Sequence, residues 1–447
     1  MNDNNDYLAR PTNQNLGHIA GNDGWPLFGR ALSFYQDPHA ICEQHYRDYG
    51  AVSRIAMGPE RTLLALGPDN AQALHLDTTK NFSSEKGLER FSHLIGGSLI
   101  MKDFAEHRFQ RRLMQTAFKT AAMREYAGAI NEICARNVHA MANMGEFTLI
   151  KHVKQTLLEV AARVFTGVEG QGQEGDELTN AFERFVEAFD YIFPIDLPGF
   201  KYHRGIKAKE DIDRFIRSMI DHKRQNHDQD ILAHFCREKN DEGKLFSDQD
   251  IAENFVLLLF AAQDTTTASL VNAFYELGRH PQWQHNIREE SLALGRSDLS
   301  FEAVAGMPSA GLVFNEAQRL HASVPLFPRR SIRDCELSGI EVPADTMIMN
   351  VITFNHRMPE WWTDPLRFDP MRFERNEHKQ HPFLFHPFGG GAHKCIGMHF
   401  AQYVFKTFLH HCLSHYRIRL ADGYEAKYRY LPMSMPKDGL PLRLERI

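Results

Sequence analysis

The stretch HPFGGGAHKCIGMHFA, residues 386–401, is the most informative part of this 447-residue sequence. Its three consecutive glycines allow positive φ angles and let the backbone come close to a flat partner. From Gly397 onward, large apolar residues recur at helical spacing, at Phe400, Val404, Phe405 and Phe408. The pattern therefore predicts that Cys395 lies in a loop just before a helix, where free amide donors and the helix dipole favour the thiolate over the thiol.

Three other roles for this segment stay open from the residues alone. A lone cysteine is most often a buried structural residue. The glycines could bind phosphate, although the run matches neither the GxGxxG nor the P-loop pattern. Cys395 and His399 have the i, i+4 spacing of half a zinc site, although no second pair of ligands is evident.

A long helix is predicted between Ser247 and Leu277. Ser247 is a good N-cap with Asp250 three residues further on, and Gly278 followed by Pro281 is a typical stop signal. About thirty residues at roughly 1.5 Å each give about 45 Å, which is long enough to cross a whole domain. We therefore expect this helix to be a central element of the fold.

The middle of this helix changes character. Residues 255–262 are apolar on every side, which indicates burial, but residues 263–267 read QDTTT. Such residues are mediocre helix formers, and threonine hydroxyls can bond the carbonyl four residues back. A break of the local rules inside a buried helix indicates either a functional site or a fully hydrogen-bonded polar cluster in the core.

Elsewhere the spacing is mostly helical, with a few short strands and loops. Residues 52–57 and 61–66 alternate around Gly58-Pro59-Glu60, which predicts a β-hairpin. Two further strands are predicted, at 347–352 and 440–444. Two polar stretches are interpreted as loops or helix ends, at 167–177 and 222–230.

Composition and charge exclude several classes of protein. With 43% apolar residues, the chain is neither low-complexity nor wholly disordered. Lys plus Arg number 51 and Asp plus Glu number 57, and the net charge of −6 argues against a nucleic-acid binder. The six cysteines are far apart and form no CxxC pair, as expected for reduced thiols in the cytoplasm.

No segment resembles a secretion signal or a membrane span. The first 24 residues are polar, and the longest apolar run, 255–262, is far below the roughly 18 residues that a spanning helix needs. No internal repeat or Pro/Ser-rich linker divides the chain. We therefore expect a soluble cytoplasmic protein with a single domain, residues 1–447, whose first 24 or so residues are a polar tail.

Five residues of the glycine segment fit the signature FxxGx[RH]xCxG, namely Phe388, Gly391, His393, Cys395 and Gly397. On these residues the chain resembles the cytochrome P450 superfamily, and the resemblance extends from WPLFG at 25–29 to PKDGL at 436–440. It implies a mainly α-helical fold with small β-sheets. It also implies haem b buried between the long central distal helix and a proximal cysteine loop plus helix, with Cys395 as the fifth iron ligand.

The resemblance also assigns roles to the polar break in the long helix. Residues 261–266 resemble the distal-helix pattern of the family, with Asp264 and Thr265 as the catalytic pair. Thr265 would hold dioxygen or its ordered water, and Asp264 would relay protons. Ala262 stands where many members have glycine, so we expect a slightly tighter oxygen pocket.

Glu316 and Arg319 form the ExxR pair that the family places upstream of the cysteine loop. An i, i+3 pair on a surface is worth only about 0.2 to 0.5 kcal/mol, and a buried pair needs further donors. Arg372, in the segment FDPMRF at 368–373, matches the third member that the family supplies. The implied role is structural, to shape the cysteine loop.

The remaining implied cofactor contacts come from several segments. Four cationic residues match groups that neutralise the haem propionates, namely His107, Arg111, Arg329 and His393. The other expected contacts are Ala261, Phe388, Gly389, Gly397 and Ala401.

The substrate pocket is expected to be apolar, because a strong oxidant needs water excluded and its substrate held by shape. The candidate lining residues are Phe91, Leu94, Phe189, Phe193, Phe260, Val324, Leu326 and Met433. Residues 193–208, and His393 in place of arginine, resemble the sterol demethylases, and the loop also resembles that of the retinoid hydroxylases. The leading hypothesis is hydroxylation of a terpenoid or steroid, with a fatty acid as the alternative substrate.

The partners follow from the same resemblance. No flavin or ferredoxin module follows Ile447, so we expect electrons from a separate ferredoxin or flavodoxin with an NAD(P)H-dependent reductase. A basic proximal face would attract an acidic partner of this kind, and its candidates are Arg108, Arg111, Arg112, Lys119 and Lys394. The competing hypotheses are a peroxide-driven haem enzyme of the same fold and a non-catalytic protein, either a haem sensor or a zinc-stabilised helical module.

Overall fold

The computed structural model describes residues 15–26, 28–168, 173–190, 195–240 and 243–447. These residues form two compact units, which we call the sheet unit and the helical unit. The sheet unit takes its described residues from Met1–Glu89, Val324–Arg367 and Arg375–Lys394. The helical unit takes its described residues from Arg90–Ser323, Phe368–Glu374 and Cys395–Ile447. A single domain for the whole chain stays a prediction.

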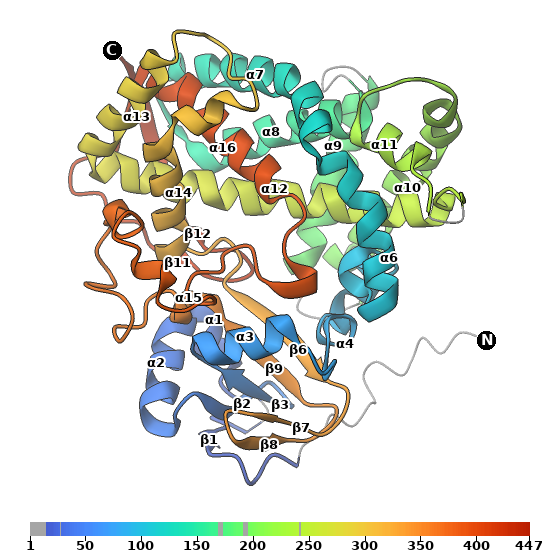
Figure 1. The fold of residues 1–447 in the computed structure, drawn as a ribbon, viewed down its shortest axis with the longest axis vertical. Helices are drawn as coiled ribbons and strands as arrows, with labels where there is room; N and C mark the ends of the chain where they lie inside the picture. The colour runs from blue at the N-terminus through green and yellow to red at the C-terminus, as the bar shows by residue number, and fades with distance from the viewer. Residues whose placement is uncertain (1–14, 27, 169–172, 191–194, 241–242) are drawn as a thin grey trace. The chain divides into compact units, whose positions relative to one another are not determined.

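The main sheet of the sheet unit has the strand order β1-β2-β3-β9-β6-β4 (Figure 1). The strands are β1 Gly21–Asn22, β2 Val52–Met57, β3 Glu60–Ala65, β4 Phe82–Ser83, β6 Leu326–Ser331 and β9 Met347–Val351. β2 and β3 are antiparallel, which confirms the predicted hairpin with its second strand beginning and ending one residue early. The predicted strand at 347–352 is confirmed up to Val351, because Ile352 begins a short helix, α15 (Ile352–Asn355).

Short helices and a second small sheet complete the sheet unit. They are α1 Ala31–Gln36, α2 Pro38–Tyr49, α3 Pro68–Leu76, α4 Ser84–Gly87, β7 Cys335–Leu337 and β8 Ile340–Val342. The core of this unit joins apolar side chains from β2, β3, β9 and α3, including Val52, Leu63, Leu74 and Ile348. The side of α3 that faces this core therefore has a fixed position relative to the sheet.

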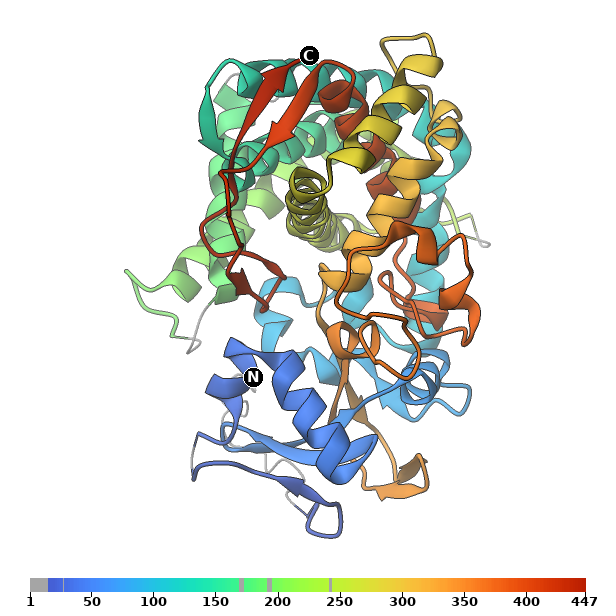
Figure 2. The ribbon, with the colours of Figure 1, turned by 90° about the vertical axis from the view of Figure 1, so that its left-hand side faces the viewer.

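The helical unit contains most of the long helices and the short helices α5 and α11. They are α5 Ser92–Ile95, α6 Phe104–Met114, α7 Thr120–Ala142, α8 Leu149–Ala161, α9 Gln173–Glu187, α10 Lys201–Gln225, α11 Ile231–Arg237, α12 Asp248–Arg279, α13 Pro281–Ala293, α14 Pro308–Leu320 and α16 Met398–Leu413. Figure 2 looks along α12 and shows the other helices of this unit arranged around it. The predicted mainly α-helical fold with small sheets is confirmed.

The long central helix α12 begins as predicted and ends later than predicted. The Ser247 hydroxyl accepts a hydrogen bond from the Asp250 amide, so the cap is the expected one. The helix runs to Arg279, two residues past the predicted end, and passes through Gly278. A Cβ on Gly278 would lie 2.6 Å from Cγ of Leu420, so this glycine allows close packing and does not stop the helix. Pro281, the other half of the predicted stop signal, begins α13.

Two small sheets also belong to the helical unit. One has the order β10-β13-β5, and the other pairs β11 with β12. The strands are β5 Glu146–Thr148, β10 Tyr416–Arg419, β11 Tyr428–Arg429, β12 Met435–Pro436 and β13 Pro441–Arg446. β13 confirms the predicted C-terminal strand, shifted toward the end of the chain. Within the described residues, no helix combines the length and the hydrophobicity that crossing a membrane requires.

Candidate active site

Cys395 differs from the other cysteines of the chain in its exposure. Its residue is exposed, whereas Cys335 is half-buried and the remaining four are buried, namely Cys42, Cys134, Cys236 and Cys412. Burial raises the pKa of the Cys134 and Cys236 thiols to about 12, which keeps them protonated and unreactive. Cys395 is therefore not a buried structural cysteine.

The position of Cys395 at the start of α16 agrees with the loop and helix predicted from the sequence. Gly397 is the N-cap residue of α16, and Phe400, Val404, Phe405 and Phe408 bury the side of the helix that faces the core. The cysteine thus lies two residues before the N-cap. Free amide groups and the positive end of the helix dipole are concentrated at this point, and both stabilise a thiolate.

Arg111 of α6 lies within electrostatic reach of Cys395. Burial lowers the pKa of the Arg111 guanidinium, and the negative charge of the Cys395 thiolate acts against this shift. His107 lies one turn earlier on α6 and is 2% exposed. α6 therefore brings two of the four predicted propionate contacts onto one face, and one of them lies close to the cysteine.

The glycine loop belongs to the sheet unit up to Lys394. Gly389 and Gly391 have φ angles of +66° and +60°, the left-handed values that a side chain disfavours. A Cβ on Gly391 would also overlap the carbonyl oxygen of His75. Two of the three glycines therefore take the expected positive φ angle, whereas Gly390 is extended with a φ of −157°, and the close backbone approach at Gly391 is to the end of α3.

One residue just before the polar break of α12 is open to solvent. Ala261 is exposed although it lies in the middle of a largely buried helix, and Thr265, one turn later, is half-buried. The Thr265 hydroxyl donates a hydrogen bond to the Ala261 carbonyl oxygen at 2.7 Å. The bond is the four-residue back-bond expected from the sequence, and Ala261 and Thr265 together present a small, partly polar surface.

Asp264 points to a neighbouring helix. Its carboxylate lies 2.7 Å from the Nζ of Lys154 on α8, and the two side chains are 12% and 34% exposed. The amide of Gln263 also donates to the Lys154 carbonyl oxygen, at 3.4 Å. The ion pair orients the Asp264 carboxylate toward α8, and no sequence pattern predicts Lys154 as its partner.

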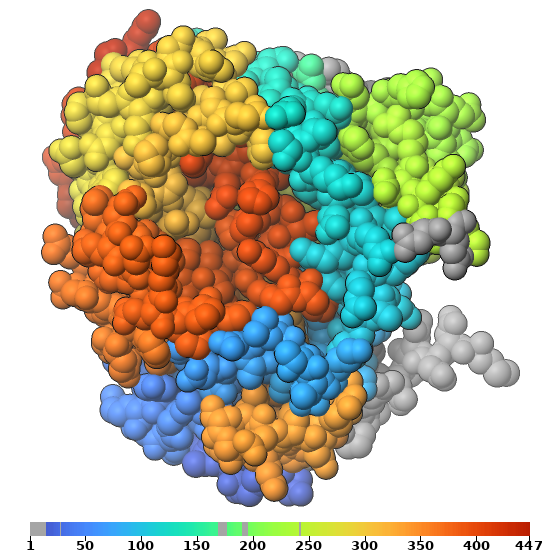
Figure 3. Space-filling model, in the orientation of Figure 1, coloured from blue at the N-terminus to red at the C-terminus, as the bar shows by residue number. Residues whose placement is uncertain are grey.

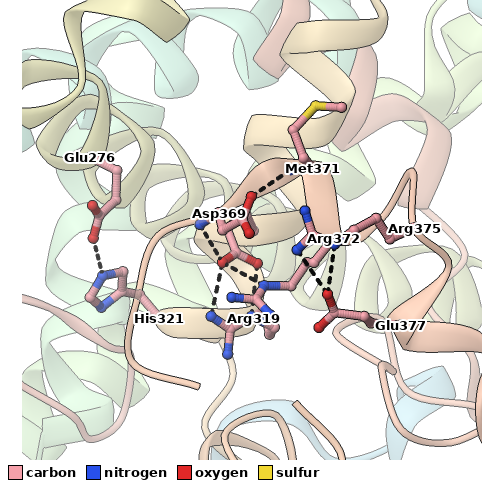
Figure 4. A network of polar contacts seen from close by, with 9 residues as sticks. Glu276, Arg319, His321, Asp369, Met371, Arg372, Arg375 and Glu377 are labelled. Carbon is pink, nitrogen blue, oxygen red and sulfur yellow. Dashed lines mark hydrogen bonds and ion pairs between the residues drawn. The ribbon is translucent and has the colours of Figure 1, made fainter. Parts of the chain in front are cut away.

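The predicted ExxR group forms one buried network in the helical unit (Figure 4). Glu316 and Arg319 lie on α14 and are both 0% exposed, and Arg319 Nε donates to Glu316 at 2.7 Å. Arg372 lies on the short 3-10 helix Pro370–Arg372 and donates through Nε to the other Glu316 oxygen at 3.0 Å. A terminal nitrogen of Arg319 and the Asp369 amide add a third and a fourth donor, each at 2.9 Å. The carboxylate thus has several donors, as a buried charge requires.

Three of the predicted substrate residues lie in one aromatic cluster of the helical unit. The Phe189 and Phe260 rings are stacked at 3.9 Å, and Phe91 lies 5.6 Å from Phe189. Phe185, which the sequence analysis missed, contacts Phe189 at 5.3 Å and Phe260 at 6.4 Å. Its spacing of four residues before Phe189 on the same chain segment is the signal that could have found it.

The other candidates are distributed as follows. Leu94 of α5 is fully buried, Met433 is 9% exposed, and Ala401 lies half-buried in the first turn of α16. The candidates in the sheet unit are Val324, Leu326, Arg329, Phe388, Gly389 and His393. Phe193 lies outside the described residues.

Four of the five charged candidates for a docking face are exposed, and Arg111 is half-buried. Arg108 and Arg112 lie on α6 and Lys119 follows it, all three in the helical unit. Lys394 is also exposed and ends the sheet unit. Figure 3 shows orange-red residues at the surface of the helical unit between its cyan and yellow helices.

The residues present fit a haem bound through a thiolate. The exposed thiol before a helix N-terminus supplies an anionic sulfur ligand, and the exposed Ala261 offers a flat contact surface in the middle of α12. A zinc site is disfavoured, because the described residues contain no group of three or more His, Cys, Asp or Glu side chains that could hold a metal ion.

Comparisons with known proteins agree with a protein that binds haem through a thiolate. A family model described as cytochrome P450 matches residues 19–440, and the chain therefore belongs to the cytochrome P450 family. Members of this family are monooxygenases, and so is this chain. The resemblance stated from the sequence is confirmed.

Two relatives and one solved structure show which known proteins this chain is similar to. Cytochrome P450 136 of Mycobacterium tuberculosis is 34% identical over 446 residues, covering 97% of this chain and 90% of that protein. Abscisic acid 8'-hydroxylase 4 of Arabidopsis thaliana is 26% identical over 437 residues, covering 95% and 92%. The structure of retinoic acid-bound cyanobacterial CYP120A1 has a TM-score of 0.85 at 23% identity, covering 96% and 99%, and shows that the fold is shared.

Proposed function

We propose that this chain is a haem-thiolate hydroxylase of a terpenoid or steroid, with Cys395 as the iron ligand. The observation that carries the proposal is the exposed Cys395 thiol before the N-terminus of α16, beside the Arg111 guanidinium. Haem b with a thiolate ligand supplies the activation of O2 and the transfer of one oxygen atom to a C–H bond. The protein supplies binding, orientation, proton delivery and the exclusion of water.

Cys395 and its surroundings set the charge of the ligand. Amide groups at the start of α16 favour the thiolate, and Arg111 adds a nearby positive charge. His107, Arg111, Arg329 and His393 bind the propionates in this proposal. Contacts of the propionates with fixed cations orient the cofactor and hold it in the protein.

Asp264 and Thr265 deliver protons in this proposal. Asp264 is held by Lys154, whose side chain is 34% exposed, so solvent reaches this side of the ion pair. The carboxylate can accept a proton on this side and pass it toward the adjacent hydroxyl of Thr265. That hydroxyl donates to the Ala261 carbonyl and still has lone pairs that can accept from an ordered water.

The proposed substrate is a lipophilic ring compound bound against the aromatic cluster. Phe91, Phe185, Phe189 and Phe260 offer ring faces, and stacked or edge-on contacts suit planar or alicyclic ligands. The relatives named for abscisic acid and retinoic acid support a terpenoid class. A fatty acid is the alternative.

The electron donor in this proposal is a separate acidic ferredoxin or flavodoxin with an NAD(P)H-dependent reductase. Exposed Arg108, Arg112 and Lys119 support it, because they form a basic group at and after α6 in the helical unit. A peroxide-driven enzyme is the alternative, and the intact Asp264–Thr265 pair argues against it.

A spectral titration of the ferric protein tests the substrate class. Terpenes, steroids and fatty acids are added in turn, and the change from low spin to high spin is recorded. The proposal expects saturable changes with the first two classes and weaker changes with fatty acids. Saturable changes with fatty acids alone would replace the substrate class and leave the reaction type standing.

A further inference from the structure

His75 is a buried histidine for which the proposed reaction has no role. It lies near the end of α3 in the sheet unit and is 7% exposed. Neither Nδ1 nor Nε2 of its ring has a hydrogen-bond partner among the described residues. Buried polar groups are nearly always hydrogen-bonded, so two unpartnered nitrogens on one ring indicate a group that the protein chain does not itself supply.

Aromatic rings fix the orientation of the His75 ring. It is stacked on Phe383 with the centroids 5.7 Å apart and the planes at 17°. Phe327 and His386 meet it edge-on, each with a centroid distance of 5.3 Å. The ring is therefore held on its face and at its sides, and its nitrogens have a fixed direction.

Gly389 of the glycine loop lies beside the nitrogen-bearing edge of this ring. A Cβ on Gly389 would lie 3.6 Å from Cε1, the carbon between the two ring nitrogens. A side chain at this position would therefore begin directly over the nitrogen-bearing edge. Glycine at this position places no side chain against this edge, in addition to allowing the positive φ angle of +66°.

Among the described residues, none of the groups that act electrostatically on His75 is acidic. Burial and then electrostatic interactions with His386, Arg329 and His393 lower the pKa of His75 to about 2. No carboxylate is among these groups. A neutral imidazole N–H next to cationic side chains is a favourable site for an anion, and a carboxylate provides two planar acceptor oxygens.

We propose that His75 binds a carboxylate, and that this carboxylate is a propionate of the haem. His75 donates one ring N–H to it, next to the predicted contacts Arg329 and His393. The inference rests on the proposed haem function and adds a residue that carries none of the sequence motifs. Its role is to hold and orient the cofactor.

His75→Phe tests the proposal, because phenylalanine keeps the ring stack and removes both nitrogens. The control is His39→Phe, in which a half-buried histidine of the same unit with an unpartnered Nε2 and a ring contact to Phe354 is changed in the same way. Circular dichroism and urea unfolding first establish that both variants are folded.

The first measurement is the rate of haem transfer from the purified holoenzyme to apomyoglobin. Loss of one hydrogen bond to a charged group predicts a rate about tenfold higher or more in His75→Phe, with the His39→Phe control within about twofold of the parent. The resonance Raman bending bands of the propionates provide a second readout, and they shift only in His75→Phe.

The second measurement distinguishes the two sources of a carboxylate. The parent and His75→Phe are titrated with a fatty acid and its methyl ester, and both are reconstituted with haem and with haem dimethyl ester. The proposal expects the preference for haem over its ester to fall in His75→Phe, and the preference for the acid over its ester to stay unchanged.

The possible failures are distinct. Unchanged haem transfer and unchanged Raman bands in His75→Phe would overturn this inference and leave the proposed function intact. Loss of the acid preference with normal haem retention would assign the carboxylate to the substrate and overturn the propionate assignment. A parent protein that binds no haem would refute the proposed function itself.

Discussion

Replacement of Glu316 by glutamine removes the carboxylate charge that Arg319 and Arg372 share, in a network where these three residues are each 0% exposed. The amide has nearly the shape of the carboxylate, so packing is kept, but the two buried guanidinium groups lose the negative charge of Glu316. Breaking a buried pair by removing one partner costs about 3 to 5 kcal/mol, because the remaining charge is buried and uncompensated. For a chain of this length, that corresponds to a fall in Tm of about 3 to 5 °C, from an unfolding entropy of about 2.1 cal/mol/K per residue.

Urea unfolding followed by circular dichroism measures this loss. The matched control is Glu302→Gln, which breaks an ion pair with Arg124 whose side chains are 53% and 62% exposed, and exposed pairs contribute about 0 to 1 kcal/mol. If Glu316→Gln is as stable as the control, the reasoning about buried charge is wrong. Faster haem loss in Glu316→Gln is also expected, because Arg372 and Asp369 connect the network to the segment that leads into the cysteine loop.

Three further predictions concern the reaction, the pH dependence and the pocket. Thr265→Ala is expected to consume reductant but to yield at least about tenfold less product per electron, with peroxide released instead, and full coupling would contradict the role of this hydroxyl. His411 accounts for part of the acid sensitivity: burial lowers its pKa to about 4, so the unfolded state takes up the proton first as pH falls below about 6.5, and stability decreases by up to about 3 kcal/mol at pH 4. His411→Gln should lose less stability than the parent between pH 7 and pH 4.5 in urea titrations, and equal losses would refute this. Phe260→Ala removes the ring stacked on Phe189 and should weaken the spin-state response to a ring-shaped ligand by about threefold to tenfold, whereas unchanged affinity would exclude these rings from the site.

Several parts of the fold follow from local sequence patterns. The hairpin of β2 and β3 was predicted from alternation around Gly58, and the N-cap of α12 from Ser247 and Asp250. These features depend on residues close together in the chain. The predicted end of α12 was wrong. Gly278 is needed there because Leu420, which is distant in sequence, packs closely against it.

The candidate site also contains residues that local motifs predict and residues that depend on contacts distant in the sequence. The cysteine loop and the Glu316–Arg319 pair are local motifs, so the sequence alone indicates them. Lys154 as partner of Asp264 depends on the packing of α8 against α12, and no spacing rule connects these residues. His75 belongs to an ordinary short helix, and only its burial with both nitrogens unpartnered distinguishes it.

The measurement that tests the central claim most directly is the absorption spectrum of the reduced, purified protein after addition of carbon monoxide. Thiolate ligation by Cys395 predicts the long-wavelength Soret band and its loss in Cys395→Ser. The control is Cys335→Ser, which changes a half-buried cysteine of the sheet unit and should keep the band. A folded parent protein without this band, or a Cys395→Ser variant that keeps it, would contradict the account.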